Sequence, residues 1–203
     1  MPIQNSLPNK PLTMRITGGR FCGRRVVIPR GELEIRPAMD RMRESLFSVL
    51  GPLDGLSFCD LFSGSGCVGL EAASRGAVLV DLVEMDRSKK ATIEKNTEFA
   101  KPYCDIRLFC SDVLKFIPEC NRKYDVVYAD PPFPMPDKTR LALLVSENKT
   151  VNEGGRFVIH IPSSEADLWE ERIGNLTLKD TRIYGRNMVK IYVGSQLQSQ
   201  LQN

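Results

Sequence analysis

The residues of this chain best suited to chemistry stand at the end of an apolar run, in the segment YDVVYADPPF at residues 124–133. The β-branched and aromatic run predicts a buried strand, and two prolines, which lack an N–H group, must end it. The strand therefore ends in the carboxylate of Asp130, the carbonyl groups of Pro131 and Pro132, and the ring of Phe133. Open α/β sheets bind their ligands at this end of their strands, which makes the segment a candidate site. A plain strand exit is the alternative, because Asp and Pro are common turn residues.

This group of residues suits chemistry on the exocyclic amino group of a nucleobase. Such a nitrogen is a poor nucleophile because its lone pair is delocalised into the ring, and acceptors for its N–H groups localise the lone pair again. Asp130 and the Pro131 carbonyl supply acceptors, and Phe133 offers a face on which an extruded base can stack. Guanine presents N1–H and N2–H side by side, which an acceptor-only carboxylate complements better than an amide does. Asp130 therefore favours guanine over adenine, although proline carbonyls alone would also serve an adenine.

A second candidate site is the glycine-rich turn FSGSGCVG at residues 62–69, which follows the apolar segment LSFCDL at residues 56–61. A strand, a glycine turn and then a helix form a nucleotide-type pocket, in which Gly64 and Gly66 allow close approach of the backbone to the ligand. The G-x-G-x-x-G spacing is a weak signal when it stands alone. Its position after an expected strand strengthens it.

Acidic residues follow the next two expected strands. The segment VLVDLVE at residues 78–84 ends in Glu84, whose carboxylate would hold both hydroxyl groups of a ribose, or would initiate a helix together with Asp86. The segment DIRLFC at residues 105–110 is followed by Asp112, which either meets an adenine amino group or caps the next helix. The residues alone leave both pairs of roles open.

The hydrophobic periodicity predicts the elements that position these residues. We expect helices at residues 67–75, 87–101, 137–148 and 164–173, and strands at residues 56–61, 78–84, 105–110, 124–129, 155–161, 176–183 and 188–193. Five of the strands are linked through helices, and the last two form a hairpin. This pattern predicts one doubly wound α/β sheet of seven strands with an antiparallel edge strand.

The first 50 residues carry nine Lys or Arg and four acidic residues, a net charge of +5, whereas the whole chain carries +3. We expect a small hairpin at residues 14–29 and a helix at residues 40–50, with Asp40 at its N-terminus. The planar arginine fork suits phosphates, so this segment predicts an RNA-binding extension, with a plain solvated hairpin as the alternative. The arginines concerned are Arg15, Arg20, Arg24, Arg25, Arg36, Arg41 and Arg43.

Length and composition limit the remaining possibilities. A chain of 203 residues that is 42% hydrophobic can bury one main core. Six cysteines without C-x-x-C spacing indicate free thiols in a reducing cytoplasm, and a single histidine argues against a zinc site. No apolar run is long enough to span a bilayer, and we expect a cytoplasmic monomer. The expected organisation is a flexible leader (1–13), the basic extension (14–50), one catalytic domain (51–194) and a disordered tail (195–203).

Several segments, taken in order, closely resemble one known family. They are MRITGGRFCGRRV, IRPAMDRMRESLFSVL, CDLFSGSGCVGLEAASRGA, VEMD and YADPPF. They resemble the RsmD family of bacterial small-subunit ribosomal RNA guanine-N2 methyltransferases over roughly residues 14–193. The resemblance implies a Rossmann-like class I methyltransferase fold with strand order 3-2-1-4-5-7-6 and S-adenosylmethionine as methyl donor. It also implies a guanine of 16S rRNA as the target, at the site usually numbered 966, within a 30S subunit or an assembly intermediate.

Carried over by position, the resemblance assigns two sets of site residues. The donor would be bound by Asp60, Phe62, Ser63, Gly64, Gly66, Glu84, Met85, Asp112 and Val113, and the guanine by Asp130, Pro131, Pro132 and Phe133. The chain departs from the family pattern at Ala38 and Met39, where threonines are usual. It departs again at His160–Ser164, where an acid-containing segment is usual. The first departure removes any polar contact from the usual threonines, and the second concerns the rim of the target pocket.

Two other classes of function remain open. Adenine-N6 DNA methyltransferases and protein-glutamine methyltransferases use a related strand end, but their usual Asn and Tyr are Asp130 and Phe133 here. From a different class, the chain could be a non-catalytic, RNA-binding ribosome assembly factor that retains a donor pocket. A labelled-methyl transfer assay separates these functions.

Overall fold

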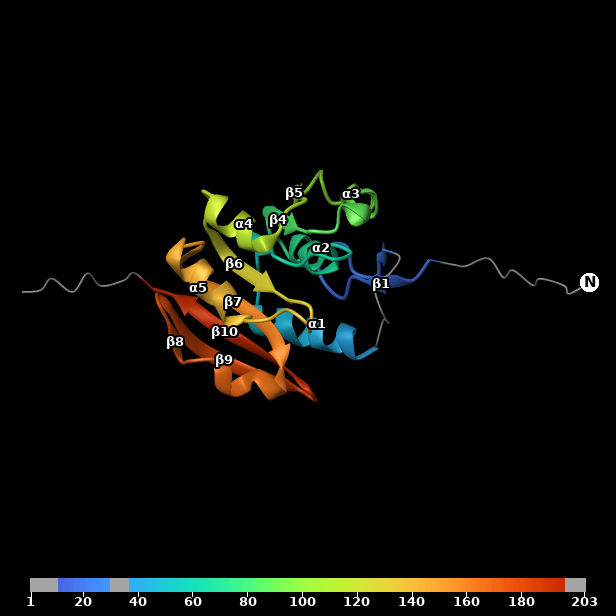
Figure 1. Ribbon diagram of the computed structural model, residues 1–203. Helices are drawn as coiled ribbons and strands as arrows, with labels where there is room; N and C mark the ends of the chain where they lie inside the picture. Colours follow the sequence, from blue (N-terminus) through green and yellow to red (C-terminus); the bar gives the residue numbers. More distant parts are fainter. Residues whose placement is uncertain (1–10, 30–36, 196–203) are drawn as a thin grey trace, which may run out of the picture.

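The computed structural model describes residues 11–29 and 37–195, with the side chains of residues 37–39 excepted. Arg36, the side chains of Ala38 and Met39, and most of the expected leader and tail lie outside the described residues. Within them the chain forms one large mixed sheet and a separate two-stranded hairpin (Figure 1). The hairpin pairs β1 (Thr13–Arg15) with β2 (Arg25–Val27).

The large sheet has the strand order β5-β4-β3-β6-β7-β10-β9-β8. The first five strands in this order are parallel, and β10 is antiparallel to both β7 and β9. The strands are β3 (Ser57–Asp60), β4 (Leu79–Val83), β5 (Asp105–Phe109), β6 (Tyr124–Ala129), β7 (Val151–Pro162), β8 (Arg172–Ile173), β9 (Leu176–Tyr184) and β10 (Asn187–Gly194).

The doubly wound α/β sheet is therefore confirmed as the fold class. All seven expected strands are present, and numbered along the chain they read 3-2-1-4-5-7-6 across the sheet. β8 is an eighth strand that the sequence did not lead us to expect. The closing hairpin of β9 and β10 lies where we placed it.

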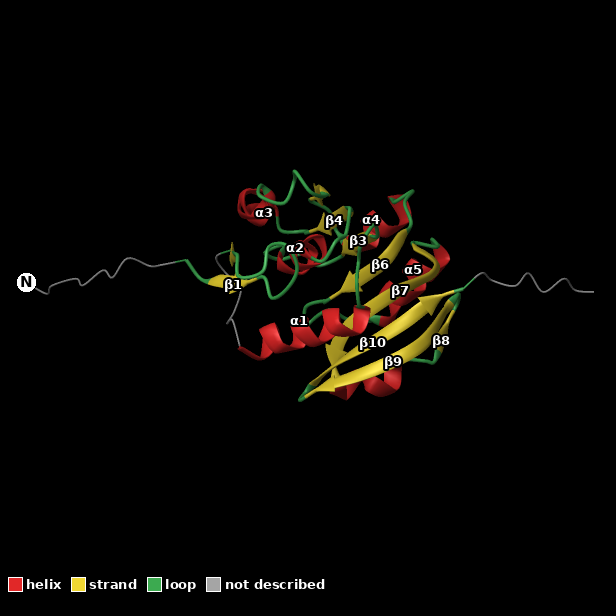
Figure 2. Cartoon of the chain, turned by 180° about the vertical axis from the view of Figure 1, so that it is seen from behind, coloured by secondary structure: helices red, strands yellow, loops and turns green. Residues whose placement is uncertain are grey.

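Helices cover both faces of the sheet (Figures 1 and 2). One face carries α1 (Pro37–Leu50), α2 (Cys67–Ser74) and α3 (Lys90–Thr97), and the other carries α4 (Val113–Glu119) and α5 (Thr139–Glu147). Two short 3₁₀ helices, η1 (Arg87–Lys89) and η2 (Ser163–Leu168), join these elements. Leu46 and Phe47 of α1 pack in the same core as Phe58 of β3. We expected the basic extension to end at residue 50 and the catalytic domain to begin at residue 51. In the structure, α1 and β3 lie on either side of this boundary but share one hydrophobic core.

Three expected helices differ from the structure. The helix expected at residues 164–173 is wrong, because η2 ends at Leu168 and Ile173 begins a hairpin by pairing with Leu176. A turn at Gly174, where φ is +57°, makes that pairing possible, and Trp169 packs its ring against Tyr192. A helix of residues 164–173 could not satisfy both contacts.

The other two differences concern helix ends. α3 ends at Thr97 and not at residue 101, and residues 98–101 form turns before Pro102. α1 starts at Pro37, three residues earlier than expected, since a proline fits the first turn of a helix. Asp40 lies in that first turn, as we expected.

The six cysteines are all free, and Cys59, Cys67 and Cys104 are buried. Among the described residues, no helix has the length and apolar character needed to cross a membrane.

Candidate active site

A cavity of about 740 Å³, which we call the larger cavity, lies where the carboxyl ends of β3, β4, β5 and β6 meet. This is the edge at which open parallel sheets bind their ligands. Six of the nine residues expected to bind the donor line it: Phe62, Gly64, Glu84, Met85, Asp112 and Val113. Asp130, Pro132 and Met135 close it on the β6 side.

A second cavity of about 370 Å³, the smaller cavity, lies between α1 and the glycine turn. Its wall includes Met42, Arg43 and Leu46 of α1, together with Met14 and Tyr128. The two cavities share four lining residues, Phe62, Gly64, Asp130 and Pro132. A ligand in each cavity would therefore meet its neighbour beside Asp130.

The glycine turn is built by backbone geometry that favours glycine. Gly64 and Gly66 have φ of +52° and +80°, in the left-handed region. A Cβ atom on Gly69 would lie 2.3 Å from Leu82 Cδ2, so only glycine lets α2 pack this closely on β4. Gly66 lies at the start of α2 and lines neither cavity.

Glu84 fastens this turn to the end of β4. Its Oε2 accepts a hydrogen bond from the Gly64 N–H at 2.9 Å, and its Oε1 accepts one from the Asp86 N–H at 2.8 Å. Lys89 Nζ lies 3.3 Å from Oε2. The acid that caps the following η1 is Asp86, which accepts from the Ser88 N–H. Glu84 thus keeps its carboxylate at the wall of the larger cavity.

Asp112 performs the capping role that we considered for it. Its Oδ1 accepts a hydrogen bond from the Leu114 N–H at 2.9 Å at the start of α4. The residue also lines the larger cavity beside Val113. Capping uses Oδ1 alone, so Oδ2 remains able to meet the amino group of an adenine.

Asp60 lies beneath the glycine turn, is only 1% exposed, and lines neither cavity. Its Oδ1 is 3.4 Å from the Phe62 N–H, while Oδ2 is buried without a partner among the described residues. Burial raises the pKa of Asp60 to about 7, and the charges of Asp130 and Glu84 add to the rise. A cationic group placed next to this carboxylate would satisfy the orphaned oxygen. Ser63, also buried, donates its hydroxyl to the Asp60 carbonyl oxygen at 2.9 Å.

At the end of β6, Asp130 pairs with a residue that sequence reasoning did not connect with it. His160 Nδ1 lies 2.8 Å from Asp130 Oδ1. Pro131 is buried, while Phe133 is 69% exposed and lines neither cavity; it lies on a third hollow beside Trp169. The ring of Phe133 is therefore open to solvent and does not form a wall of the smaller cavity.

Lys138 is a second residue that sequence reasoning did not select. It is 5% exposed, and its ammonium group donates to the carbonyl oxygens of Phe133 at 3.1 Å and Met135 at 3.2 Å. It also pairs with Glu165 Oε1 at 2.7 Å. This lysine ties the loop after Asp130 to the segment that follows β7. The carboxylate that pairs with Lys138 is 27 residues away along the chain. The sequence around Lys138 therefore does not indicate that this lysine is buried.

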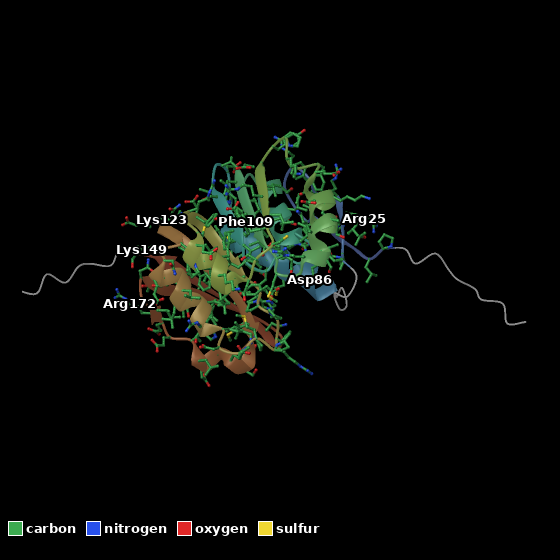
Figure 3. All side chains as sticks on the ribbon, turned by 45° about the horizontal axis from the view of Figure 1, so that its top comes forward. Arg25, Asp86, Phe109, Lys123, Lys149 and Arg172 are labelled. Carbon is green, nitrogen blue, oxygen red and sulfur yellow. The ribbon has the colours of Figure 1, made fainter. Side chains whose placement is uncertain are left out.

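Five of the expected RNA-binding arginines are exposed: Arg15, Arg20, Arg24, Arg25 and Arg41. The guanidinium groups of Arg20 and Arg24 lie over the rings of Tyr103 and Phe99, at 4.6 and 3.9 Å from the ring centroids. Figure 3 places Arg25 on the same side of the molecule as Asp86. The labelled Lys123, Lys149 and Arg172 lie on the opposite side.

Arg43 departs from this set because it is 4% exposed. Its guanidinium group pairs with Asp40 at 2.9 Å and with the fully buried Glu71 at 3.4 Å, and it donates to the Arg15 carbonyl oxygen. Glu71 also accepts hydrogen bonds from the N–H and hydroxyl groups of Thr17, both at 2.8 Å. Arg43 thus holds the hairpin against α1 and α2, and its charge is already paired. We remove it from the phosphate-binding set.

The fold and site together define a class of protein. A doubly wound sheet with an antiparallel final hairpin, a glycine turn after the first strand of the sheet, and an acid at the end of the second is the arrangement of class I methyltransferases. A solved structure described as a putative methyltransferase from Escherichia coli is similar, with a TM-score of 0.77 and 28% identity. The match covers 90% of this chain and 98% of that one.

The family described as conserved hypothetical protein 95 matches residues 14–193, and the chain belongs to it; this confirms the resemblance to the RsmD family. A curated relative, ribosomal RNA small subunit methyltransferase D of Escherichia coli K12, is 38% identical over 121 residues, or 59% of this chain. The match spans only about 60% of that relative's length. The fold is shared with a Thermus thermophilus 16S rRNA N2 G1207 methyltransferase solved with AdoMet and guanosine, at a TM-score of 0.68 and 22% identity. That match covers 92% of this chain and 50% of the other.

Proposed function

We propose that this protein transfers a methyl group from S-adenosylmethionine to the exocyclic N2 of a guanine in small-subunit ribosomal RNA. The observation that carries the proposal is the position of Asp130, which lines both the larger and the smaller cavity. A donor in one cavity and a base in the other would bring the reacting atoms together beside this carboxylate. The family membership and the relative named as a ribosomal RNA methyltransferase support ribosomal RNA methylation.

The larger cavity fits the donor. Glu84, held by two backbone N–H groups, would accept hydrogen bonds from the ribose hydroxyls, and Asp112 and Val113 would adjoin the adenine. Asp60, whose Oδ2 is buried without a partner among the described residues, would face the ammonium group of the methionine part. Bound S-adenosylmethionine supplies an electrophilic sulfonium methyl group.

The smaller cavity would receive the guanine edge. Asp130 would accept hydrogen bonds from N1–H and N2–H, and the carbonyl of Pro131 would accept the second N2 hydrogen. As the N2 lone pair forms the new N–C bond, the C–S electron pair passes to sulfur, and N2 then gives up one proton to a carboxylate oxygen of Asp130. Placing the nitrogen against the methyl group and stabilising the growing positive charge would supply most of the acceleration. Phe133 presents an exposed ring at the rim for base stacking.

The exposed arginines would bind the RNA backbone around the flipped base. Arg15, Arg20, Arg24, Arg25 and Arg41 are exposed, so their charge is open to solvent. The target that the family resemblance favours is the guanine usually numbered 966, presented by a 30S subunit or an assembly intermediate, with a single copy of the chain acting on it.

The test uses purified protein, radiolabelled S-adenosylmethionine and two substrates, free small-subunit RNA and particles that lack the modification. We expect N2-methylguanine at one mapped nucleotide. Asp130→Ala should abolish transfer while S-adenosylhomocysteine still binds, and Asp137→Asn, an exposed acid of the same loop, should transfer normally. Equal turnover by Asp130→Ala would contradict the assigned role.

The same assay separates the rival functions. N6-methyladenine or a methylated protein in place of N2-methylguanine would identify one of the other methyltransferases. RNA binding without any labelled product from the unchanged protein would identify a non-catalytic assembly factor.

A further inference from the structure

The only histidine of the chain, His160, lies next to the carboxylate on which the proposed reaction depends. It stands near the end of β7, two residues after Val158, which is buried in the core under α1. Because side chains alternate along a strand, His160 points to the same face of the sheet as Val158. Tyr128 and Asp130 share that face at the end of β6, and both line the smaller cavity.

The contact between the two side chains is close and sheltered. His160 Nδ1 is 2.8 Å from Asp130 Oδ1, and the side chains are 13% and 35% exposed. His160 Nε2 is buried and has no hydrogen-bond partner among the described residues. His160 itself lines neither cavity, and its contact with the lining of both runs through Asp130.

Two independent arguments assign the proton of this imidazole. A carboxylate only accepts hydrogen bonds, so the short contact requires a hydrogen on Nδ1. A hydrogen on Nε2 would be a buried donor without an acceptor, which proteins avoid more strictly than an unpaired acceptor. The first argument places a hydrogen on Nδ1 and the second leaves Nε2 bare, so together they select the Nδ1–H tautomer.

We propose that His160 is a positioning residue for Asp130: it donates from Nδ1 to Oδ1 and thereby turns Oδ2 toward the smaller cavity. This role rests on the proposed function, because it gives Asp130 one oxygen to anchor and one to receive the guanine N–H groups. Asp130 Oδ2 has no partner among the described residues, which agrees with an oxygen reserved for a ligand. The pair also explains why a histidine is buried with one nitrogen unsatisfied.

Loss of the His160 side chain should lower kcat and leave donor binding unchanged. Without the donor on Oδ1, the carboxylate can rotate, so the transition-state contact to N2 weakens while the donor cavity is unchanged. His160→Leu should lower kcat about 10- to 100-fold, the effect of losing one hydrogen bond to a charged group. The KM for S-adenosylmethionine should stay within about twofold, because the missing hydrogen bond acts on the chemical step. His160→Asn, whose side-chain N–H reaches the same place as Nδ1, should recover most of the rate.

A spectroscopic readout tests the pair without any turnover. Since the chain has one histidine, protein labelled with ¹⁵N-histidine gives a single imidazole spectrum. We expect the full-length protein near neutral pH to show Nδ1 protonated and Nε2 bare. Asp130→Ala should shift the Nδ1 signal, because its hydrogen loses the carboxylate acceptor, and Asp137→Asn should leave the signal unchanged.

The outcomes distinguish this inference from the proposed function. Failure of the unchanged protein to methylate RNA would overturn the proposed function before any His160 variant is made. Active protein with an imidazole protonated on Nε2 would overturn the inference alone. So would a His160→Leu variant that binds S-adenosylhomocysteine normally and turns over at the unchanged rate.

Discussion

The backbone N–H of Gly64 donates a hydrogen bond to Oε2 of Glu84 at 2.9 Å, which joins the glycine turn after β3 to the end of β4. The carboxylate that would hold the ribose therefore also shapes the turn beneath the donor. Its other oxygen is oriented by the Asp86 N–H, so both oxygens are fixed before a ligand arrives. This preorganisation lowers the cost of ordering the site on binding.

Replacing Glu84 should consequently weaken donor binding more than the loss of one exposed charge would. We expect Glu84→Ala to reduce the affinity for S-adenosylhomocysteine about 10- to 100-fold, because a hydrogen bond to a charged group is lost and the turn loses its anchor. Isothermal titration calorimetry measures the change. Glu94→Ala, an exposed acid on α3, is the matched control and should bind normally. Unchanged affinity in Glu84→Ala would argue against the larger cavity as the donor site.

Asp60 makes stability depend on pH in a defined direction. Burial raises its pKa in the folded protein from 3.8 to about 7, so between these values the folded state holds a proton that the unfolded chain has released. Stability should therefore fall as pH rises from about 4 to about 7, by on the order of 1 kcal/mol per pH unit. Asp60→Asn should remove this fall. Urea unfolding at a series of pH values compares the two proteins, and parallel curves would show that Asp60 carries no such shift.

The strands and the donor side of the site could be predicted from sequence because both are encoded locally. Apolar runs bounded by Gly and Pro place β3, β4 and β6, and the acids that follow parallel strands necessarily gather at one edge of the sheet. Gly64, Glu84 and Asp112 line one cavity for this reason. The helix expected at residues 164–173 was wrong because its polar periodicity gave no hint that Ile173 would pair with Leu176.

The guanine side was predictable only in part, because it depends on interactions between distant segments. The burial of Arg43 follows from Glu71, 28 residues away, and the partner of Asp130 is 30 residues away on β7. A basic residue in a basic segment carries no sign that its charge is already paired. The smaller cavity is likewise formed by the docking of α1 against the glycine turn, which no periodicity of either segment specifies.

Arg43 and Arg41 both lie on α1, but Arg43 is buried and paired whereas Arg41 is exposed, so alanine variants of the two can be compared. Arg43→Ala removes one of two arginines paired with the buried Glu71, since Arg75 stays 2.8 Å from Glu71 Oε1. It should destabilise the protein by about 1–3 kcal/mol, whereas exposed Arg41→Ala should change stability by less than about 0.5 kcal/mol. Urea unfolding measures both. Arg43→Lys keeps the charge without the planar fork and should lie between them, which guards against a variant that does not fold. Equal stabilities of the two alanine variants would contradict the buried network.

The hairpin arginines should determine how strongly RNA binding depends on salt. Replacing Arg24 and Arg25 by Ala should weaken binding and reduce the slope of log K against log salt by about one for each phosphate that is no longer neutralised. Filter binding or fluorescence anisotropy over a range of salt concentrations measures the slope. Lys123→Ala with Arg172→Ala removes two charges from the opposite side of the molecule and should leave the slope unchanged. Identical slopes in both double variants would place the RNA elsewhere.

Lys138 should matter for both stability and catalysis, because it fixes the loop that begins at Asp130. Lys138→Met removes the donor to the carbonyl oxygens of Phe133 and Met135 and leaves Glu165 without its Lys138 partner. We expect a loss of about 1–3 kcal/mol in the free energy of unfolding, the cost of unsatisfied buried groups. A lower kcat should accompany it, since a small displacement of the carboxylate misaligns the attacking nitrogen.

The matched control for Lys138 is Lys115→Met, which removes an exposed lysine from α4. This variant should keep both the unfolding midpoint in urea and the methyl-transfer rate of the unchanged protein. Because S-adenosylhomocysteine occupies the other side of Asp130, its affinity should survive in both lysine variants. If Lys138→Met had the same unfolding midpoint and methyl-transfer rate as Lys115→Met, the contacts of Lys138 with the loop after Asp130 would have no role in placing the carboxylate.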